Sequence, residues 1–426
     1  MRAAIWFLIL FAVAVALALF AGPNASSVTV FFAPYRVDLS LNLVLVLLLF
    51  AFVLLHVALR ALGALFELPR QARRWRAQQK ERAMHVALMD AHTHLLTGRF
   101  LRARKCADAA LHQEATLREA GEAAPQGAQV RAMAHVLAAE SAHALQDAAS
   151  RDRHLQQVLD EALQPGRGHG ELAEGARLRA ANWALDDQAP QDALQWLEQL
   201  PQGVSRRMVT LRTRLKAARL AGLPMQALDT ARALIRHRAF TPEAGTSLLR
   251  SLAGDALRQA HDLTQLEKTW RALEPAERII PEVVCVAAQR ALQVAPTNNR
   301  SAGATLARQW IEGVWPHYAS MGYTTRERLV GLLEASLDDA DTAWLARIEA
   351  AQQRLPHDAN LQYLAGMACV RRQLWGKAQL LLSSAATGLS DERMRRHTWA
   401  TLSTLAEARG DFDASQAALA QAAALR

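Results

Sequence analysis

Three histidines and one cysteine between positions 85 and 106 are of types that ligate metals or haem iron. They are His85, His92, His94 and Cys106. His92 and His94 stand two positions apart, and on a helix such residues point in different directions rather than at one ligand. Two interpretations follow: a ligand set for iron or another metal, or histidines that are exposed or packed. The spacing favours the second, and we predict no metal site.

The other reactive residue types form no catalytic pattern. Cys106, Cys285 and Cys369 are isolated in the sequence, which excludes a disulfide framework and indicates small apolar residues in helices. The glycine segment 164–170 lacks the preceding strand and the final spacing of a dinucleotide-binding loop. Gly376 and Lys377 lack the upstream glycine of a P-loop. We therefore predict no catalytic residue and no bound cofactor.

One basic stripe is a candidate binding surface. Arg212, Lys216 and Arg219 lie at helical spacings of four and three, so one helix face carries all of them. In a stack of helix pairs the first helix of each pair lines the inner, concave surface, and we expect the stripe to line it. Such cations bind carboxylates, for example a partner's chain terminus or an acidic ligand. The alternative is an ordinary solvated basic face.

Composition predicts the elements that carry these side chains. The chain has 426 residues, of which 51% are hydrophobic and 6% aromatic, and this excludes wholesale disorder. Alanine, the best helix former, is abundant, so an all-α protein is expected. Of the formal net charge of +9, residues 1–82 carry +6 and the other 344 residues only +3. The charge therefore indicates membrane topology, and we predict no nucleic-acid binding.

Two apolar segments near the N-terminus are long enough to cross a membrane. Residues 3–21 carry no charge, and residues 39–59 are interrupted only by Ser40, Asn42 and His56. Helices of about 20 residues match the ~30 Å hydrocarbon core. A cleaved signal peptide is the alternative for the first segment. We predict two uncleaved transmembrane helices in residues 1–59, joined by a short periplasmic loop at about 22–38.

The charges that flank the second segment indicate its orientation. Seven bases and two acids lie in residues 60–82, whereas the outer loop has one of each. The positive-inside rule places the basic side in the cytoplasm, and a bacterial inner membrane is the expected location. We expect residues 60–82 to form a basic juxtamembrane helix, broken at Pro69, that contacts anionic lipids. The lipid-facing basic cluster comprises Arg70, Arg73, Arg74, Arg76, Lys80 and Arg82.

The outer loop has an alternating pattern of side chains. Val28 and Val30 alternate with Thr29, and beyond Pro34 the segment 37–40 alternates in the same way. A small β-hairpin on the membrane surface fits this pattern. An irregular connector is the alternative.

The body, residues 83–426, has the spacing of tetratricopeptide-like repeats. In such repeats small residues stand where two helices cross, and large apolar residues fill the gap to the next pair. The units near Ala193 and Ala227 lie one 34-residue period apart. Further units contain Gly98-Arg99-Phe100, Gly366 with Ala378, and Ser403 with Ser415, and weaker units lie near 131–163, 255–273 and 301–315. We predict a cytoplasmic α-solenoid; a generic alanine- and leucine-rich bundle is the alternative.

The order of these segments resembles the HemY family of proteobacterial inner-membrane proteins. Val28-Thr29-Val30, followed by the segment Tyr35-Arg36-Val37-Asp38-Leu39-Ser40, is similar to that family's V-x-[VIL] … Y-x-[IV]-[DE]-x-S element. The basic run Arg73-Arg74-Trp75-Arg76 and the first repeat are similar too, so the resemblance is most specific in the first 110 residues.

The resemblance implies a role in a late stage of protohaem or tetrapyrrole biosynthesis, and it transfers no catalytic residue. A different enzyme of the same name oxidises protoporphyrinogen with FAD. This sequence lacks that enzyme's N-terminal Gly-x-Gly-x-x-Gly after a strand, so its activity is not expected here.

Three functions remain open. The first is a non-enzymatic, membrane-anchored scaffold that holds haem-pathway enzymes at the cytoplasmic face, where anchoring raises their effective concentration. The second is direct binding of haem or porphyrin, with Arg212, Lys216 and Arg219 on the propionates and His92 on the iron. The third is a generic cell-envelope assembly scaffold, which the same repeats would serve.

Overall fold

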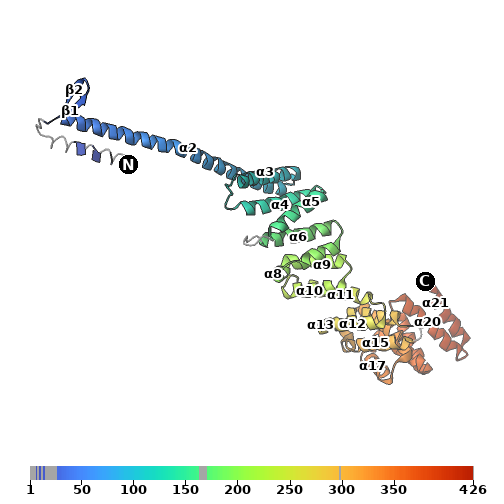
Figure 1. Ribbon diagram of the computed structural model, residues 1–426. Coiled ribbons are helices and arrows are strands. Elements are labelled where there is room, and N and C mark those ends of the chain that lie inside the picture. Colours follow the sequence, from blue (N-terminus) through green and yellow to red (C-terminus); the bar gives the residue numbers. More distant parts are fainter. Residues whose placement is uncertain are drawn as a thin grey trace. The chain divides into compact units, whose positions relative to one another are not determined.

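The computed structural model describes residues 26–162, 170–296 and 299–425, together with positions 6, 9, 10, 13 and 14. The expected first span at 3–21 therefore lies almost wholly outside the described residues. The chain divides into two compact units, Met1–His169 and Gly170–Arg426. Within the described residues, helices make up both units apart from one two-stranded sheet (Figure 1).

The predicted β-hairpin is present, so the outer segment is not an irregular connector. β1 (Ser27–Phe32) pairs antiparallel with β2 (Tyr35–Ser40), in a register that runs from Ser27 opposite Ser40 to Phe32 opposite Tyr35. At the tip, Phe31 is 75% exposed and Phe32 is 77% exposed. The hairpin thus presents aromatic side chains to its surroundings, immediately before the apolar helix begins.

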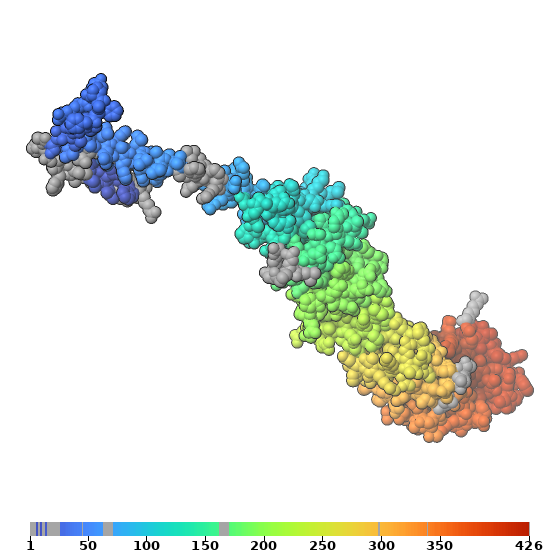
Figure 2. Space-filling view, viewed as in Figure 1, coloured from blue at the N-terminus to red at the C-terminus, as the bar shows by residue number. Residues whose placement is uncertain are grey.

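That helix, α2 (Leu41–Leu96), is one continuous element of 56 residues. The Ser40 hydroxyl caps its first turn by accepting a hydrogen bond from the backbone N–H of Leu43. At 1.5 Å per residue the helix is about 84 Å long. Its N-terminal part projects from α3–α5 of the same unit as a narrow arm (Figures 1 and 2).

The expected break at Pro69 is wrong, because the backbone of α2 is helical on both sides of it and through it. A proline removes one N–H donor and crowds one carbonyl, a penalty of about 3 kcal/mol. Helix propagation on both sides of the proline is cooperative, so one defect does not end a helix of this length. The basic segment is therefore a direct continuation of the apolar one.

Of the described helices, only α2 contains a segment long and apolar enough to cross a membrane. That segment is Leu41–Leu62, with a mean hydropathy of 2.8 and none of its most apolar window buried. It coincides with the second of the two expected spans. The structure thus shows one candidate span where the sequence predicts two.

The rest of the first unit is built on the C-terminal part of α2. This part packs on α3 (Phe100–Glu119), α3 packs on α4 (Gly127–Ala144), and α4 packs on α5 (Ala148–Ala162). The interior is mainly alanine, which lets the helices approach closely. Its fully or nearly buried residues include Met84, Ala91, Ala103, Ala107, Leu117, Val130 and Ala138.

The second unit is a stack of helix pairs. Among the described residues of this unit, five pairs of helices that are neighbours in the sequence pack as hairpins: α6 (Gly170–Asp186) with α7 (Pro190–Glu198), α9 (Met208–Leu220) with α10 (Pro224–Arg236), α14 (Pro281–Val294) with α15 (Arg300–Glu312), α18 (Ala359–Arg371) with α19 (Trp375–Gly388), and α20 (Glu392–Glu407) with α21 (Phe412–Ala424). The remaining long helices continue the stack: α11 (Pro242–Arg258), α12 (Leu263–Ala272), α16 (Tyr323–Glu334) and α17 (Thr342–Arg354). Short segments α8 (Gln202–Ser205), α13 (Pro275–Arg278), η2 (Trp315–Ser320) and η3 (Leu337–Asp339) connect them.

Contacts between successive pairs identify this stack as an α-solenoid. The helices α11, α14, α16 and α18 contact one another in turn, so alternate helices form one layer of the stack. Each pair thereby buries its apolar face against the next, as the repeat spacing predicts. The core is continuous from α9 to α21.

Small residues stand at the helix crossings, where the sequence predicted them. A Cβ added to Gly366 would lie 2.8 Å from the Leu382 side chain, so α18 and α19 approach too closely for any larger residue. At the next pair the hydroxyl oxygens of Ser403 and Ser415 are 2.8 Å apart and buried. Ala193 and Ala227, on α7 and α10, are both fully buried.

Candidate functional site

The predicted basic stripe lies on one exposed face of α9. Arg212, Lys216 and Arg219 are all exposed, whereas Leu211 and Leu215 face the core. No ion pair joins the three cations to an acidic side chain among the described residues. The stripe is therefore available for an anionic partner, and its position on a concave surface stays a prediction.

The lipid-facing basic cluster is carried by α2 directly beyond the apolar span. Arg73, Arg74, Arg76, Lys80 and Arg82 are all exposed. The side chain of Arg70 is outside those that the structure describes. The cluster lies between the apolar span and the first buried residue of the repeat body, Met84. Contact with lipid headgroups stays a prediction.

The N-terminal histidines do not converge. His92 is exposed and His94 is half-buried, while the His85 ring donates from Nδ1 to the carbonyl of Glu81 at 2.8 Å. Among the described residues, no group of three His, Cys, Asp or Glu side chains is arranged to hold a metal ion. The geometry accords with histidines in packing or solvent-facing positions.

The cysteines occupy packing positions. Cys285 and Cys369 are buried in α14 and α18, as expected, whereas Cys106 is half-buried. Burial raises the pKa of the Cys285 thiol to about 11 and also raises the pKa of the other two thiols. At neutral pH each is therefore a protonated thiol rather than a nucleophilic thiolate.

Sequence reasoning missed a histidine pair between α4 and α5. The Nδ1 atoms of His135 and His154 are 2.9 Å apart, so one ring donates and the other accepts. Burial, followed by the His154 and Arg131 charges, lowers the pKa of His135 to about 4, and burial also lowers the pKa of His154. Both rings are therefore neutral at pH 7. The two positions are 19 residues apart on different helices, and no sequence motif joins them.

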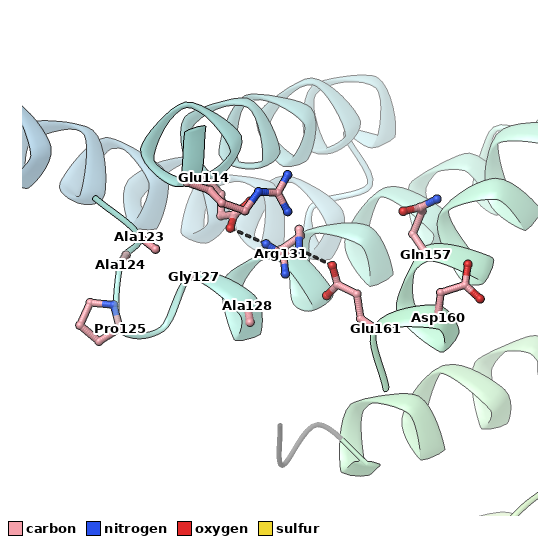
Figure 3. A pocket seen from close by; sticks show the side chains of 11 residues that line it. Glu114, Ala123, Ala124, Pro125, Gly127, Ala128, Arg131, Gln157, Asp160 and Glu161 are labelled. Carbon is pink, nitrogen blue, oxygen red and sulfur yellow. Dashed lines mark hydrogen bonds and ion pairs between the residues drawn. The ribbon is translucent and has the colours of Figure 1, made fainter. Parts of the chain in front are cut away.

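Sequence reasoning also missed a polar groove of about 560 Å³ among α3, α4 and α5 (Figure 3). Its centre is Arg131, which is 9% exposed and donates from Nη1 to Glu114 and from Nε to Glu161. Each glutamate keeps one buried oxygen without a hydrogen-bond partner. We name this site the α3–α5 groove; its lining comprises Glu114, Arg118, Ala123, Ala124, Pro125, Gly127, Ala128, Arg131, Gln157, Asp160 and Glu161.

A second groove, of about 380 Å³, lies beside α12, α13 and α15 in the other unit. Trp270 and Trp310 stack there with ring centroids 4.8 Å apart. Arg271 and the 63% exposed Ile279 also line the groove. We name it the tryptophan groove; it combines flat aromatic surface with a guanidinium group.

Comparison with known proteins identifies the N-terminal part of the chain. Residues 26–146 match the family model described as the HemY protein N-terminus. No curated protein matches the chain.

Two solved structures are similar over most of the chain but at low sequence identity. One is the structure of Naa15/Naa10 bound to HypK-THB, which is 13% identical, covers 78% of this chain and has a TM-score of 0.26. This chain spans 56% of the length of that structure's chain. The other is the crystal structure of the P58(IPK) TPR domain, with 14% identity, 79% of this chain and 98% of that chain covered, and a TM-score of 0.19.

The family match covers the β-hairpin, the long helix α2 and the first helices of the repeat body, which are also the segments in which the sequence resemblance is most specific. Residues 26–146 are therefore similar to the N-terminal part of HemY-family proteins.

Proposed function

We propose that the protein is a non-enzymatic, membrane-anchored scaffold that acts in a late stage of protohaem or tetrapyrrole biosynthesis. The observation that carries this proposal is α2, which contains both an apolar segment long enough to span a membrane and the first buried face of the repeat body. A body built on its own anchor is held at the membrane surface, where hydrophobic porphyrins partition. Binding partners there gain effective concentration without any new contact.

The non-enzymatic part of the proposal rests on the packing and hydrogen bonding of the cysteine and histidine side chains. The cysteines are protonated packing residues, and His135 and His154 are occupied with each other. The haem part rests on the match of residues 26–146 to the HemY N-terminus family model. The expected partners are haem-pathway enzymes bound on the repeat surfaces, together with anionic lipids. A bacterial inner membrane with the body in the cytoplasm is the proposed location.

Porphyrin profiling after deletion of the gene tests the pathway role. Accumulation of a late porphyrin intermediate, restored to normal by the intact chain, is the expected result. A normal porphyrin profile would contradict the pathway role and leave a generic envelope scaffold as the better interpretation.

Crosslinking and pull-down from solubilised membranes test the scaffold role and the stripe on α9. We expect pathway enzymes among the captured proteins, and R212A/K216A/R219A to reduce their recovery several-fold. The matched control is R236A/K268A/R300A, which removes three exposed cations from the same unit. Equal recovery with both triple variants would remove the stripe from the proposal. Absence of any pathway enzyme above background would contradict the scaffold.

Direct binding of haem or porphyrin is the second candidate, and the tryptophan groove is the observation that favours it. Trp270 stacks on the buried Trp310 and lines the groove together with Arg271, which forms an ion pair with Glu267. A planar macrocycle with carboxylates would use the flat aromatic surface and compete for the guanidinium group. His92 does not line the tryptophan groove, so iron ligation by His92 stays a separate prediction.

Absorbance titration with haem separates the two candidates. Direct binding gives a saturable Soret shift that Trp270→Ala weakens at least fivefold and that the exposed-site control His92→Ala leaves unchanged. Featureless, unsaturable uptake by all three proteins would contradict direct binding.

A further inference from the structure

The α3–α5 groove contains more buried acceptor atoms than its own donors satisfy. Glu114 is only 5% exposed, and the Glu161 side chain is 12% exposed. Arg131 donates to one oxygen of each carboxylate, and Oε2 of both glutamates has neither a donor nor exposed surface of its own. Buried carboxylate oxygens are hydrogen-bonded in most proteins. Two unpaired carboxylate oxygens on either side of one arginine therefore indicate that a hydrogen-bond donor from outside the chain binds here.

The charge of the groove points to a cationic donor. Its lining carries the carboxylates of Glu114, Asp160 and Glu161 against the guanidinium groups of Arg118 and Arg131. The groove therefore has one net negative charge at neutral pH. In a partly desolvated site this charge is screened less than at an open surface, and it favours a cation over a neutral donor.

The free acceptors suit an ammonium group better than a guanidinium group. A guanidinium binds best when both oxygens of one carboxylate face its planar fork. Here each carboxylate already uses one oxygen for Arg131, so the spare oxygens belong to two different side chains on opposite sides of it (Figure 3). A compact ammonium has three divergent donors and can bridge single oxygens of separate groups once the two carboxylates turn towards the groove.

The wall of the groove suits an aliphatic stem. Ala123, Ala124 and Pro125 line it on the side of Glu114, within a volume of about 560 Å³ (Figure 3). Methylene groups that carry the charge can lie against these residues while the head group points inward. We propose that the α3–α5 groove binds a primary ammonium group on an aliphatic chain, as a lysine side chain or an aliphatic polyamine presents it.

Calorimetric titration of the full chain in detergent micelles tests the proposal. The probes are N-acetyl-lysine amide, its Nε-acetylated form as the neutral analogue, and putrescine as the second source of the same chemistry. We expect the first and third probes to bind saturably, and the neutral analogue to bind at least tenfold more weakly. Tighter binding of putrescine assigns the groove to a polyamine, and tighter binding of the lysine amide assigns it to a protein side chain.

Variants locate the binding in the groove. Glu161→Gln keeps the side-chain shape, removes the charge, and is expected to weaken both cationic probes at least fivefold. Asp152→Asn is the matched control, because its carboxylate lies on α5 outside the groove lining and is 62% exposed. Asp160→Asn is the second test variant, since its exposed carboxylate lies outside the buried hydrogen bonds and can be removed without disturbing them.

Two results would overturn the proposal. One is equal affinity for the charged and the Nε-acetylated lysine amide. The other is unchanged affinity in both Glu161→Gln and Asp160→Asn at an unchanged melting temperature and helical circular dichroism. Because these measurements involve no pathway enzyme or porphyrin, their failure would leave the scaffold proposal standing, and failure of that proposal would leave this one standing.

Discussion

At the scale of single residues, the His135–His154 pair makes the stability of the first unit depend on pH. The folded state lowers the pKa of both rings, so the unfolded chain binds more protons at pH values between the folded and the unfolded pKa. The stabilising contribution is complete above the ordinary histidine pKa of about 6.5 and is lost as the pH falls towards 4.

We expect thermal melts to lose about 1–2 kcal/mol of stability between pH 7 and pH 4.5 through this pair, a modest value because solvent partly reaches the rings. The variant H135Q/H154Q can keep a side-chain hydrogen bond and cannot titrate, so its melting temperature should vary less over this range. His92→Gln, at an exposed position, is the control. The same pH dependence in the double variant and the wild type would disprove the assignment.

A substitution at Gly303 tests how closely α14 and α15 approach each other. A Cβ at this position would lie 2.6 Å from the carbonyl oxygen of Ala291 and 2.6 Å from Cβ of Ala295. Backbone must move to admit it, so Gly303→Ala should destabilise the second unit by about 2–3 kcal/mol. Gly175→Ala, where an added Cβ meets nothing within 4 Å in α6, should instead stabilise by about 0.5–1 kcal/mol. Urea unfolding followed by circular dichroism measures both, and changes of the same sign would contradict the close approach.

At the scale of elements, the exposed bases of α2 carry the proposed lipid contact. A chain that lacks residues 1–62 should sediment with vesicles that contain phosphatidylglycerol, at about 1 kcal/mol for each base near the surface. Replacing Arg73, Arg74, Arg76, Lys80 and Arg82 with Gln should reduce this partition at least a hundredfold at low salt.

The control replaces five exposed bases of the second unit instead: Arg206, Arg236, Arg238, Lys268 and Arg300. Equal losses in the two variants, or equal sedimentation with purely zwitterionic vesicles, would contradict a specific contact through α2.

The repeat elements were predictable where small or conformationally special residues mark them. Gly98, Gly222 and Gly410 have positive φ values of 72°, 68° and 75° at the turns between paired helices, and the sequence pattern identified those units. Other turns of the same kind use Gln146, Gln188 and Gln373, also at positive φ. L-residues adopt this conformation at a modest penalty, so glutamine gives no turn signal in the sequence. The sequence predicted a break in α2 at Pro69 because proline disfavours a helix locally. Cooperative propagation of the helix on both sides of the proline is not visible in a local sequence pattern.

The α3–α5 groove was beyond sequence reasoning for a different reason. Arg131 lies 17 residues from Glu114 and 30 residues from Glu161, on three different helices. In the sequence, none of the three differs from an ordinary charged residue on an amphipathic helix. Only the packing of α3, α4 and α5 brings them together and removes them from water.

At the scale of the whole molecule, the predicted topology places the β-hairpin outside and both the basic cluster and the repeat body in the cytoplasm. We expect Phe31→Cys, at the exposed hairpin tip, to react with a membrane-impermeant maleimide in intact spheroplasts. Arg82→Cys should react only after lysis, because the positive-inside rule retains it in the cytoplasm. Labelling of both positions, or of Arg82→Cys alone, from outside would contradict this orientation.

Since α2 passes without interruption from the apolar segment to the part that packs on α3 and α4, these first helices of the repeat body have a fixed rotational phase about the anchor. Each residue inserted between Leu62 and Met84 would turn α3 and α4 by about 100° about the α2 axis and shift them by about 1.5 Å along it. A seven-residue insertion would restore their direction to within about 20° while shifting them by about 10 Å, whereas a two-residue insertion would turn them to nearly the opposite side. The distance from the apolar segment can thus be changed by whole helical turns with little change in direction.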